Sequence, residues 1–180
     1  MAHYKVFGSA VEYLRTDHEH LTRLAQRCFT AVRNRHFAQT AALTQQLCRM
    51  LTLHSLITEE ILYPEARKHD DALVADLLIG QQEILQAASR LRRHAACETE
   101  YEVTLGDLID RVERYIATSE LALFPLLERQ IPAELLCRLA LELGQRRRLL
   151  HARSGRDKSE PRGRPATRAS RSIELRARAA

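Results

Sequence analysis

Apolar residues recur at the three- and four-residue spacing of an α-helix over most of the chain, and this periodicity limits what the chain can fold into. Four long segments carry it, over residues 8–35, 38–67, 71–96 and 102–128, and a fifth, shorter segment covers 132–151. The connections between the first four are short, so neighbouring helices should run antiparallel. The pattern predicts an all-α fold, an up-down-up-down antiparallel four-helix bundle with a short fifth helix.

Composition excludes most other architectures. The 180 residues include only 6 Gly and 5 Pro, too few for a turn-rich β-sandwich or a glycine-loop nucleotide fold. No apolar run reaches the roughly 18 residues of a membrane span, and the first residues lack the pattern of a signal peptide. We therefore expect a cytoplasmic protein without membrane contact, whose four widely spaced cysteines are reduced and buried.

The formal net charge of +5 is divided unevenly along the chain. Residues 146–180 carry 12 basic and 3 acidic side chains, whereas residues 1–145 carry 16 basic and 20 acidic ones. The segment after His151 is rich in Arg, Ser, Pro and Gly and holds few large apolar residues, so it cannot bury enough surface to order itself. We expect a helical domain over 1–151 and a disordered basic tail over 152–180.

An internal repeat relates the two halves of the predicted bundle. HSLITEEILYP (54–64) aligns with YIATSELALFP (115–125), and Glu, Leu, an aromatic residue and Pro fall at matching positions. The repeat pairs polar residues that lie on the inward stripes of their helices. We call these six residues the polar layer: His18, His54, Thr58, Gln81, Tyr115 and Ser119. Buried polar groups need hydrogen-bond partners or a metal ion, so the layer is the candidate functional site.

Three blocks of the sequence resemble a known family. YLRTDHEHLTRL, LCRMLTLHSLITEEILYPEAR and ALFPLLER are similar, in order and spacing, to the hemerythrin-like (HHE cation-binding) domain, and the resemblance covers about residues 11–148. It implies a four-helix bundle. It also implies a di-iron centre with His and Glu ligands, in proteins that bind oxygen or respond to iron, oxygen or nitric oxide.

Transferred residue by residue, the resemblance retains two of six metal ligands. His18 and His54 match the histidines of the first and second helices. The other four ligand positions, two for histidines and two for carboxylates, hold Gln81 (or the adjacent Gln82), Tyr115, Thr58 and Ser119. Glu59, Glu60 and Glu120 lie one or two steps off the inward stripes, so no carboxylate is expected to face the layer.

Two iron ions in a low-dielectric core need anionic bridging ligands, which Thr, Gln, Ser and Tyr do not supply. The leading interpretation is a degenerate, metal-free site in a non-enzymatic binding or regulatory module that has no catalytic residues and an unidentified partner. One alternative is a sensor of oxygen, nitric oxide or iron that holds iron through His18 and His54. A second is binding of nucleic acid or an acidic partner through the Arg-rich tail.

Overall fold

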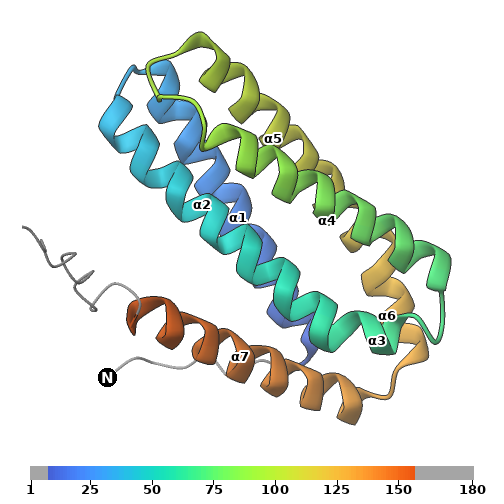
Figure 1. Ribbon diagram of the computed structural model, residues 1–180. Helices are drawn as coiled ribbons and strands as arrows, with labels where there is room; N and C mark the ends of the chain where they lie inside the picture. Colours follow the sequence, from blue (N-terminus) through green and yellow to red (C-terminus); the bar gives the residue numbers. More distant parts are fainter. Residues whose placement is uncertain (1–7, 157–180) are drawn as a thin grey trace, which may run out of the picture.

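A computed structural model describes residues 8–156, with side chains described as far as residue 152. Every regular element in this range is helical. Four antiparallel helical rods form a bundle, and a fifth helix packs against one side of it (Figure 1). The predicted all-α bundle is confirmed. Within the described range no helix is both long enough and apolar enough to cross a membrane.

The bundle consists of two helical hairpins. The first contains α1 (Ala10–Arg33), α2 (Phe37–Ile57), the π-helical turn η1 (Thr58–Leu62) and α3 (Tyr63–Ala66). The second contains α4 (Asp71–Leu91), α5 (Thr99–Thr118), the π-helical turn η2 (Ser119–Leu123) and α6 (Phe124–Gln130). In each hairpin the second rod is therefore an α-helix that continues, through one wider turn, into a short further helix.

The two π-helical turns occupy the same positions of the internal repeat. In each turn the bond that closes it spans five residues, from the Tyr63 N–H to the Thr58 carbonyl and from the Phe124 N–H to the Ser119 carbonyl. A proline follows each turn directly, and its ring nitrogen cannot donate to the preceding turn. The wider turn accommodates the missing hydrogen bond, so each rod continues as a helix past its proline. Both π-helical turns begin at a residue of the polar layer, Thr58 or Ser119.

Side-chain caps fix the starts of two helices. The Ser9 hydroxyl accepts from the backbone N–H of Glu12 at the start of α1, and the Asp70 carboxylate accepts from that of Leu73 at the start of α4. Each cap satisfies a backbone donor that has no partner inside the helix. The observed start of α4 at Asp71 agrees with the segment predicted from residue 71.

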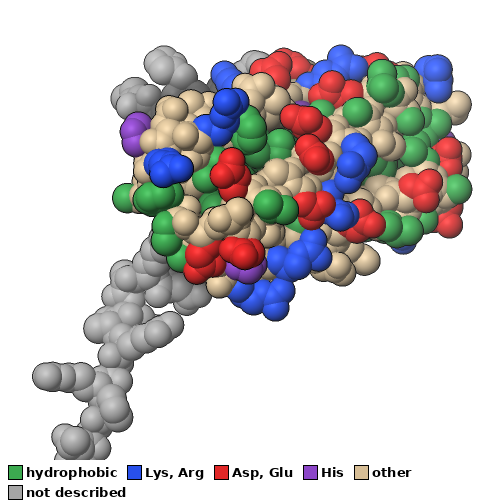
Figure 2. All heavy atoms as spheres, turned by 90° about the horizontal axis from the view of Figure 1, so that it is seen from above, with side chains coloured by type: hydrophobic (Ala, Val, Ile, Leu, Met, Phe, Trp, Pro, Cys, Tyr) green, Lys and Arg blue, Asp and Glu red, His purple; other side chains and the backbone are tan. Residues whose placement is uncertain are grey.

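Large aliphatic side chains fill the core on either side of the polar layer. Leu47, Leu105 and Leu108 are fully buried there. Acidic and basic side chains alternate over the outer face of the bundle seen in Figure 2. The expectation that all four cysteines are buried is only half right, because Cys97 and Cys137 are exposed; all four are free thiols.

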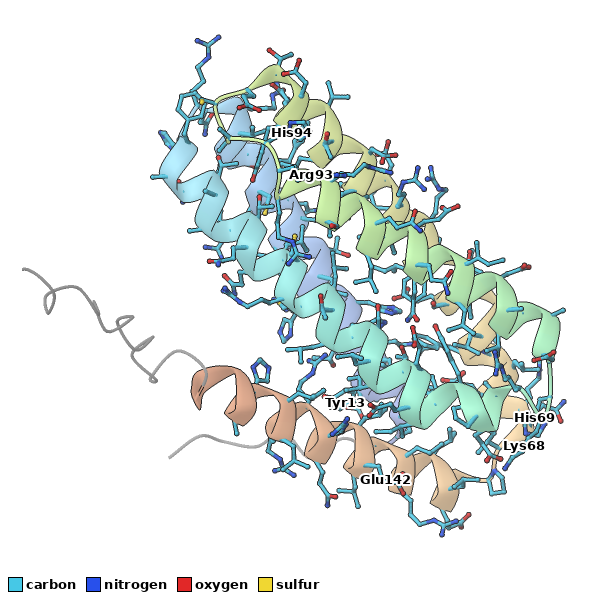
Figure 3. The ribbon with its side chains drawn as sticks, in the orientation of Figure 1. Tyr13, Lys68, His69, Arg93, His94 and Glu142 are labelled. Carbon is cyan, nitrogen blue, oxygen red and sulfur yellow. The ribbon has the colours of Figure 1, made fainter. Side chains whose placement is uncertain are left out.

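The fifth helix, α7 (Ala133–Arg156), is longer than the sequence predicted. It is 24 residues long, as α1 is, and it extends past the expected domain boundary at residue 151. It lies against α1, α2 and η1, and Tyr13 of α1 lies where the two helices meet (Figure 3). The predicted disordered tail covered residues 152–180; residues 152–156 are instead helical, as the end of α7, and residues 157–180 lie outside the described residues.

Candidate functional site

The structure places all six residues of the polar layer inside the bundle. They come from α1, α2, η1, α4, α5 and η2, so every rod contributes. Hydrogen bonds join four of them directly: His54, Thr58, Gln81 and Tyr115. Ser119 and His18 instead bond to other groups at the edges of the layer.

His54 is at the centre of the layer, and both of its ring nitrogens are engaged. Nδ1 lies 2.8 Å from Oδ2 of Asp17, and Nε2 lies 3.0 Å from the hydroxyl of Tyr115. An ionised carboxylate can only accept, so Nδ1 donates to Asp17. In the neutral ring, Nε2 then accepts from the Tyr115 hydroxyl. Neither nitrogen is left to bind anything else.

Gln81 joins Tyr115 to η1. Its amide nitrogen donates to Oγ1 of Thr58 at 2.8 Å and to the Tyr115 hydroxyl oxygen at 2.9 Å, which uses both of its protons. Tyr63 adds a third contact to Tyr115, with the two hydroxyl oxygens 2.9 Å apart. The amide oxygen of Gln81 is buried without a hydrogen-bond partner among residues 8–156. The layer is thus nearly, but not fully, self-satisfied.

Thr58 and Ser119, at the two former carboxylate positions, bond to the backbone of their own rods. The Thr58 hydroxyl lies 2.9 Å from the His54 carbonyl and 3.0 Å from that of Ser55, and Ser119 donates to the Tyr115 carbonyl at 2.9 Å. Hydroxyls of Ser and Thr often bond to the preceding turn in this way. These two hydroxyls therefore bond to backbone carbonyls of the turns that precede them.

His18 lies beside His54, with 5.2 Å between the ring centroids, and stacks on Phe124. Burial, reinforced by the neighbouring His54, lowers the pKa of His18 to about 3, so its ring is neutral near pH 7. Its Nδ1 is 3.2 Å from Oε1 of Glu120, whose side chain is 43% exposed. That contact is consequently a hydrogen bond from a neutral ring to a carboxylate. The expectation that no carboxylate faces the layer is wrong at Glu120.

Asp17 is a second carboxylate beside the layer, although none was expected there from the sequence. Asp17 is only 2% exposed and also accepts from Arg147 of α7, with Nη1 2.6 Å from Oδ1 and Nη2 on the second oxygen. Burial alone would raise the pKa of Asp17, but hydrogen bonds from His54 and Arg147 outweigh it and hold the pKa far below its usual range. A carboxylate and a guanidinium therefore neutralise one another beside the layer.

Sequence reasoning could have found one of the missed groups and not the other. Tyr63 takes the place of Phe124 in the repeat, and a tyrosine in place of phenylalanine signals a hydroxyl that needs a partner. Arg147, by contrast, is 130 residues from Asp17 and looked like one of three arginines ending a helix. Nothing in its local sequence distinguishes it from Arg146 or Arg148.

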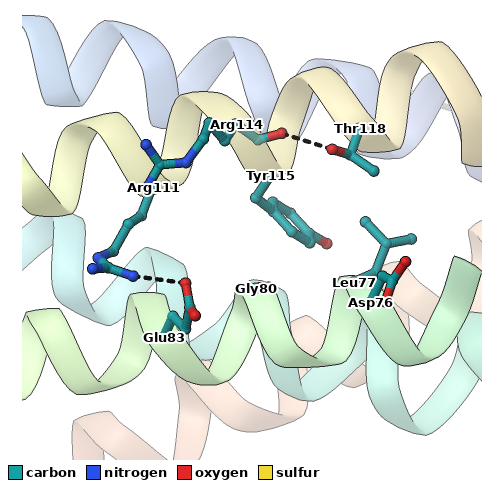
Figure 4. A pocket seen from close by; sticks show the side chains of 8 residues that line it. All are labelled: Asp76, Leu77, Gly80, Glu83, Arg111, Arg114, Tyr115 and Thr118. Atoms are coloured by element: carbon teal, nitrogen blue, oxygen red, sulfur yellow. Dashed lines mark hydrogen bonds and ion pairs between the residues drawn. The ribbon is translucent and has the colours of Figure 1, made fainter.

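A pocket of about 230 Å³ opens between α4 and α5 and reaches the ring of Tyr115. Figure 4 shows the tyrosine ring pointing from α5 toward α4 near Gly80, with the Arg111–Glu83 ion pair to one side. A Cβ at Gly80 would lie 3.8 Å from that ring, an ordinary contact. The pocket exposes one edge of the ring, whereas the hydroxyl is directed inward to the layer.

Other histidines lie outside the layer. His69 and His94 lie at opposite ends of the bundle (Figure 3), and His20, two residues from His18, is exposed. Proximity in sequence to His18 thus does not bring a second ligand into the site.

The donor set does not fit a di-iron centre. Within the described part of the chain, no three side chains among His, Cys, Asp and Glu gather closely enough to hold a metal ion. The carboxylate positions present hydroxyls, and the free oxygen of Gln81 is neutral. The buried carboxylate of Asp17, beside the layer, is already bonded to Arg147 and His54. Two metal cations there would lack anionic bridges.

Comparisons with known proteins identify the family. The family model described as hemerythrin HHE cation binding domain matches residues 9–127, which cover α1 to α6 up to Leu127. No curated protein and no solved structure matches the chain. The match spans well over half of the sequence and includes all six residues of the polar layer, so the chain belongs to the hemerythrin HHE cation-binding domain family.

Proposed function

We propose that this protein is a hemerythrin-type bundle in which a hydrogen-bonded network replaces the metal centre, and that it works as a non-enzymatic binding or regulatory module. The contact of 3.0 Å between His54 Nε2 and the Tyr115 hydroxyl carries this proposal. It engages the ring nitrogen that would otherwise be free for a metal ion, because Nδ1 already donates to Asp17.

The energetics of the layer support the same conclusion. Each buried polar group that keeps its partner avoids a desolvation cost of about 1–3 kcal/mol. Binding a metal ion through His54 Nε2 would break its bond with Tyr115 and leave the proton of the buried phenol without its acceptor. The replacement residues thus favour the metal-free state.

Iron analysis of the full-length protein, expressed in iron-replete medium, tests the proposal. We expect substoichiometric iron and no absorption band from an oxo-bridged pair. A bundle with the four absent ligands restored (Thr58→Glu, Gln81→His, Tyr115→His and Ser119→Glu) provides the positive control. Two irons per wild-type chain, with an oxo-bridge band, would overturn the proposal.

A second candidate function is a sensor of iron, oxygen or nitric oxide with one metal ion. The observation that favours it is the carboxylate of Glu120, which lies 3.2 Å from His18 Nδ1 and is partly exposed. A neutral imidazole and a carboxylate are suitable ligands for Fe²⁺. His54 would join them only by giving up its bond with Tyr115.

Anaerobic titration with Fe²⁺ separates this candidate from the first. The sensor requires one equivalent of bound metal that is lost in His18→Gln and in His54→Ala but kept in the exposed-histidine control His20→Gln. Metal binding that is unchanged by His54→Ala would remove His54 from the site, and no binding at all would exclude the sensor.

A third candidate is electrostatic binding of nucleic acid, or of an acidic partner, by the basic C-terminal segment. Two arginines of this region are already paired with carboxylates of the bundle, Arg146 with Glu60 at the surface and Arg147 with the buried Asp17. Any phosphate contacts would therefore come from arginines further along the chain. Deleting residues 157–180 should abolish salt-sensitive binding to RNA or DNA, and retained binding would refute this role.

A further inference from the structure

A groove of about 820 Å³ lies between α2 and the C-terminal part of α7, outside the polar layer. Figure 1 shows the two helices diverging toward the C-terminal end of α7. Aliphatic side chains line the groove: Met50, Leu53 and Leu56 from α2, and Leu150 from α7. The other lining residues are mostly polar and include Gln45, Gln46 and Thr52. A groove of this volume between helices, with both aliphatic and polar lining groups, is typical of a small-molecule site.

The groove is bounded by helical stretches that carry no acidic residue. α2 contains no Asp or Glu over its 21 residues, and α7 contains none after Glu142. The lining includes three arginines, which are Arg49, Arg92 and Arg147. This local excess of positive charge contrasts with the mixed charges elsewhere on the bundle (Figure 2).

The three arginines are not equivalent. Arg147 is neutralised by its bidentate contact with Asp17. Within the described range, no carboxylate pairs with Arg49 or Arg92. Both cations lie near Cys48, where they oppose the effect of burial, which raises the pKa of that thiol. The unpaired positive charge is thus concentrated at one end of the groove, around Cys48.

The aliphatic surface extends away from that charged end. Leu53 and Leu56 follow Arg49 by four and seven residues on α2, so they lie one and two turns further along, roughly 6 and 10 Å. The groove therefore has a cationic end and an apolar end. A molecule with one negative head group and one aliphatic chain complements these two ends.

Other occupants match the groove less well. The parts of this chain outside the described range are basic: residues 157–180 contain seven basic and three acidic side chains, and residues 1–7 contain Lys5. An acidic partner helix would need cations along its whole length. A nucleic acid would gain little from contact with the aliphatic side chains of the groove. Charge and shape together favour a small anionic amphiphile.

We propose that the groove between α2 and α7 binds a free fatty acid with a chain of about twelve carbons, with its carboxylate at Arg49 and Arg92 and its alkyl chain over Leu53, Leu56 and Leu150. This site goes beyond the proposed function of the polar layer and does not depend on it. Its occupant would contact Arg147 at the outer end of the network that leads through Asp17 to His54.

Calorimetric titration of the full-length protein with dodecanoate, below its micelle concentration, tests the proposal. We expect one saturable site. Octanoate, with four fewer methylenes, should bind about tenfold more weakly or worse, and dodecyltrimethylammonium, which has the same chain length and the opposite charge, should not compete. Equal binding of the two dodecyl compounds would overturn the proposal.

Variants locate the site. Leu56→Glu places a carboxylate on the aliphatic surface of the groove and should abolish binding, whereas Val103→Glu, at an exposed aliphatic residue on α5 outside the groove, should not change it. The double change Arg49→Gln with Arg92→Gln should weaken dodecanoate binding about tenfold or more. Unchanged affinity in Leu56→Glu would place any bound dodecanoate elsewhere and overturn the assignment. So would an acidic Glu/Leu helical peptide that binds where dodecanoate does not.

Discussion

Arg147 of α7 and Asp17 of α1 form a bidentate ion pair across 130 residues of sequence, with Nη1 2.6 Å from Oδ1. The carboxylate is buried, and it also fixes the ring of His54. The pair therefore links α7, which lies outside the family match, to the centre of the polar layer.

Removing Arg147 should destabilise the protein strongly, because it leaves a buried carboxylate with only His54 as a partner. We expect Arg147→Met to lower the free energy of unfolding by about 3 kcal/mol, the scale for breaking a buried ion pair. Urea denaturation measures this loss. The adjacent Arg146→Met, which breaks the exposed and solvent-screened pair with Glu60, should change the free energy of unfolding far less. Equal losses would contradict the buried role of Arg147.

Replacing Tyr115 by Phe removes the hydroxyl that His54, Gln81 and Tyr63 share. Their polar atoms would remain buried without this partner, and we expect a loss of about 2–3 kcal/mol in stability. Tyr63→Phe removes only the single contact with Tyr115 and should cost about 1 kcal/mol. Thermal and urea unfolding of the two variants would rank them, and the reverse order would show that Tyr115 is not the shared partner.

Stability should fall as the pH decreases below 6.5, because the folded state keeps His18 neutral. The unfolded chain protonates this group near pH 6.5, whereas the folded protein does so only near pH 3. Between these values the unfolded state binds more protons, so acid favours unfolding, with a slope of up to about 1.4 kcal/mol per pH unit. The Asp17 carboxylate adds further acid sensitivity below about pH 4, because its folded-state pKa is depressed.

Unfolding free energies measured from pH 7 to pH 4.5 isolate the contribution of His18. The slope over this interval should be much smaller in His18→Gln and unchanged in His20→Gln. A wild-type slope that survives in His18→Gln would assign the acid sensitivity to another group.

Restoring the four absent ligands should restore metal binding. In the chain with Thr58→Glu, Gln81→His, Tyr115→His and Ser119→Glu, the layer gains two carboxylates and two imidazoles on positions that already face inward. We expect iron uptake that the parent chain lacks, measured by metal analysis and by the rise in melting temperature on adding Fe²⁺. Adding Arg147→Met should strengthen uptake further, because it releases the Asp17 carboxylate from its ion pair and leaves a negative charge beside the layer.

Two of the four thiols should react rapidly with a thiol reagent in the native protein. Cys97 and Cys137 are exposed, whereas Cys28 and Cys48 are buried, and burial raises the pKa of Cys28 to about 11. A colorimetric thiol assay should count two fast groups before denaturation and four afterwards. Four fast groups would show that the packing around Cys28 of α1 and Cys48 of α2 opens readily.

The sequence by itself determined the helices, their antiparallel order and the positions that face inward. The reason is local: apolar periodicity, scarce glycine and proline, and the repeat around Pro64 and Pro125 act within one or two turns of helix. The same signals identified His54 and Tyr115 as inward residues of paired rods.

Only the tertiary structure decided what the polar layer does. Side chains that meet across the bundle decide whether His54 Nε2 is free or bonded to Tyr115. They also decide whether the charge of Asp17 is paired or unpaired. Arg147 reaches Asp17 because α7 continues along α1 and α2, which its own periodicity did not reveal. Hydrogen-bond direction and charge balance are long-range properties, set by packing between residues distant in sequence, so one sequence read alone could place the layer but not its partners.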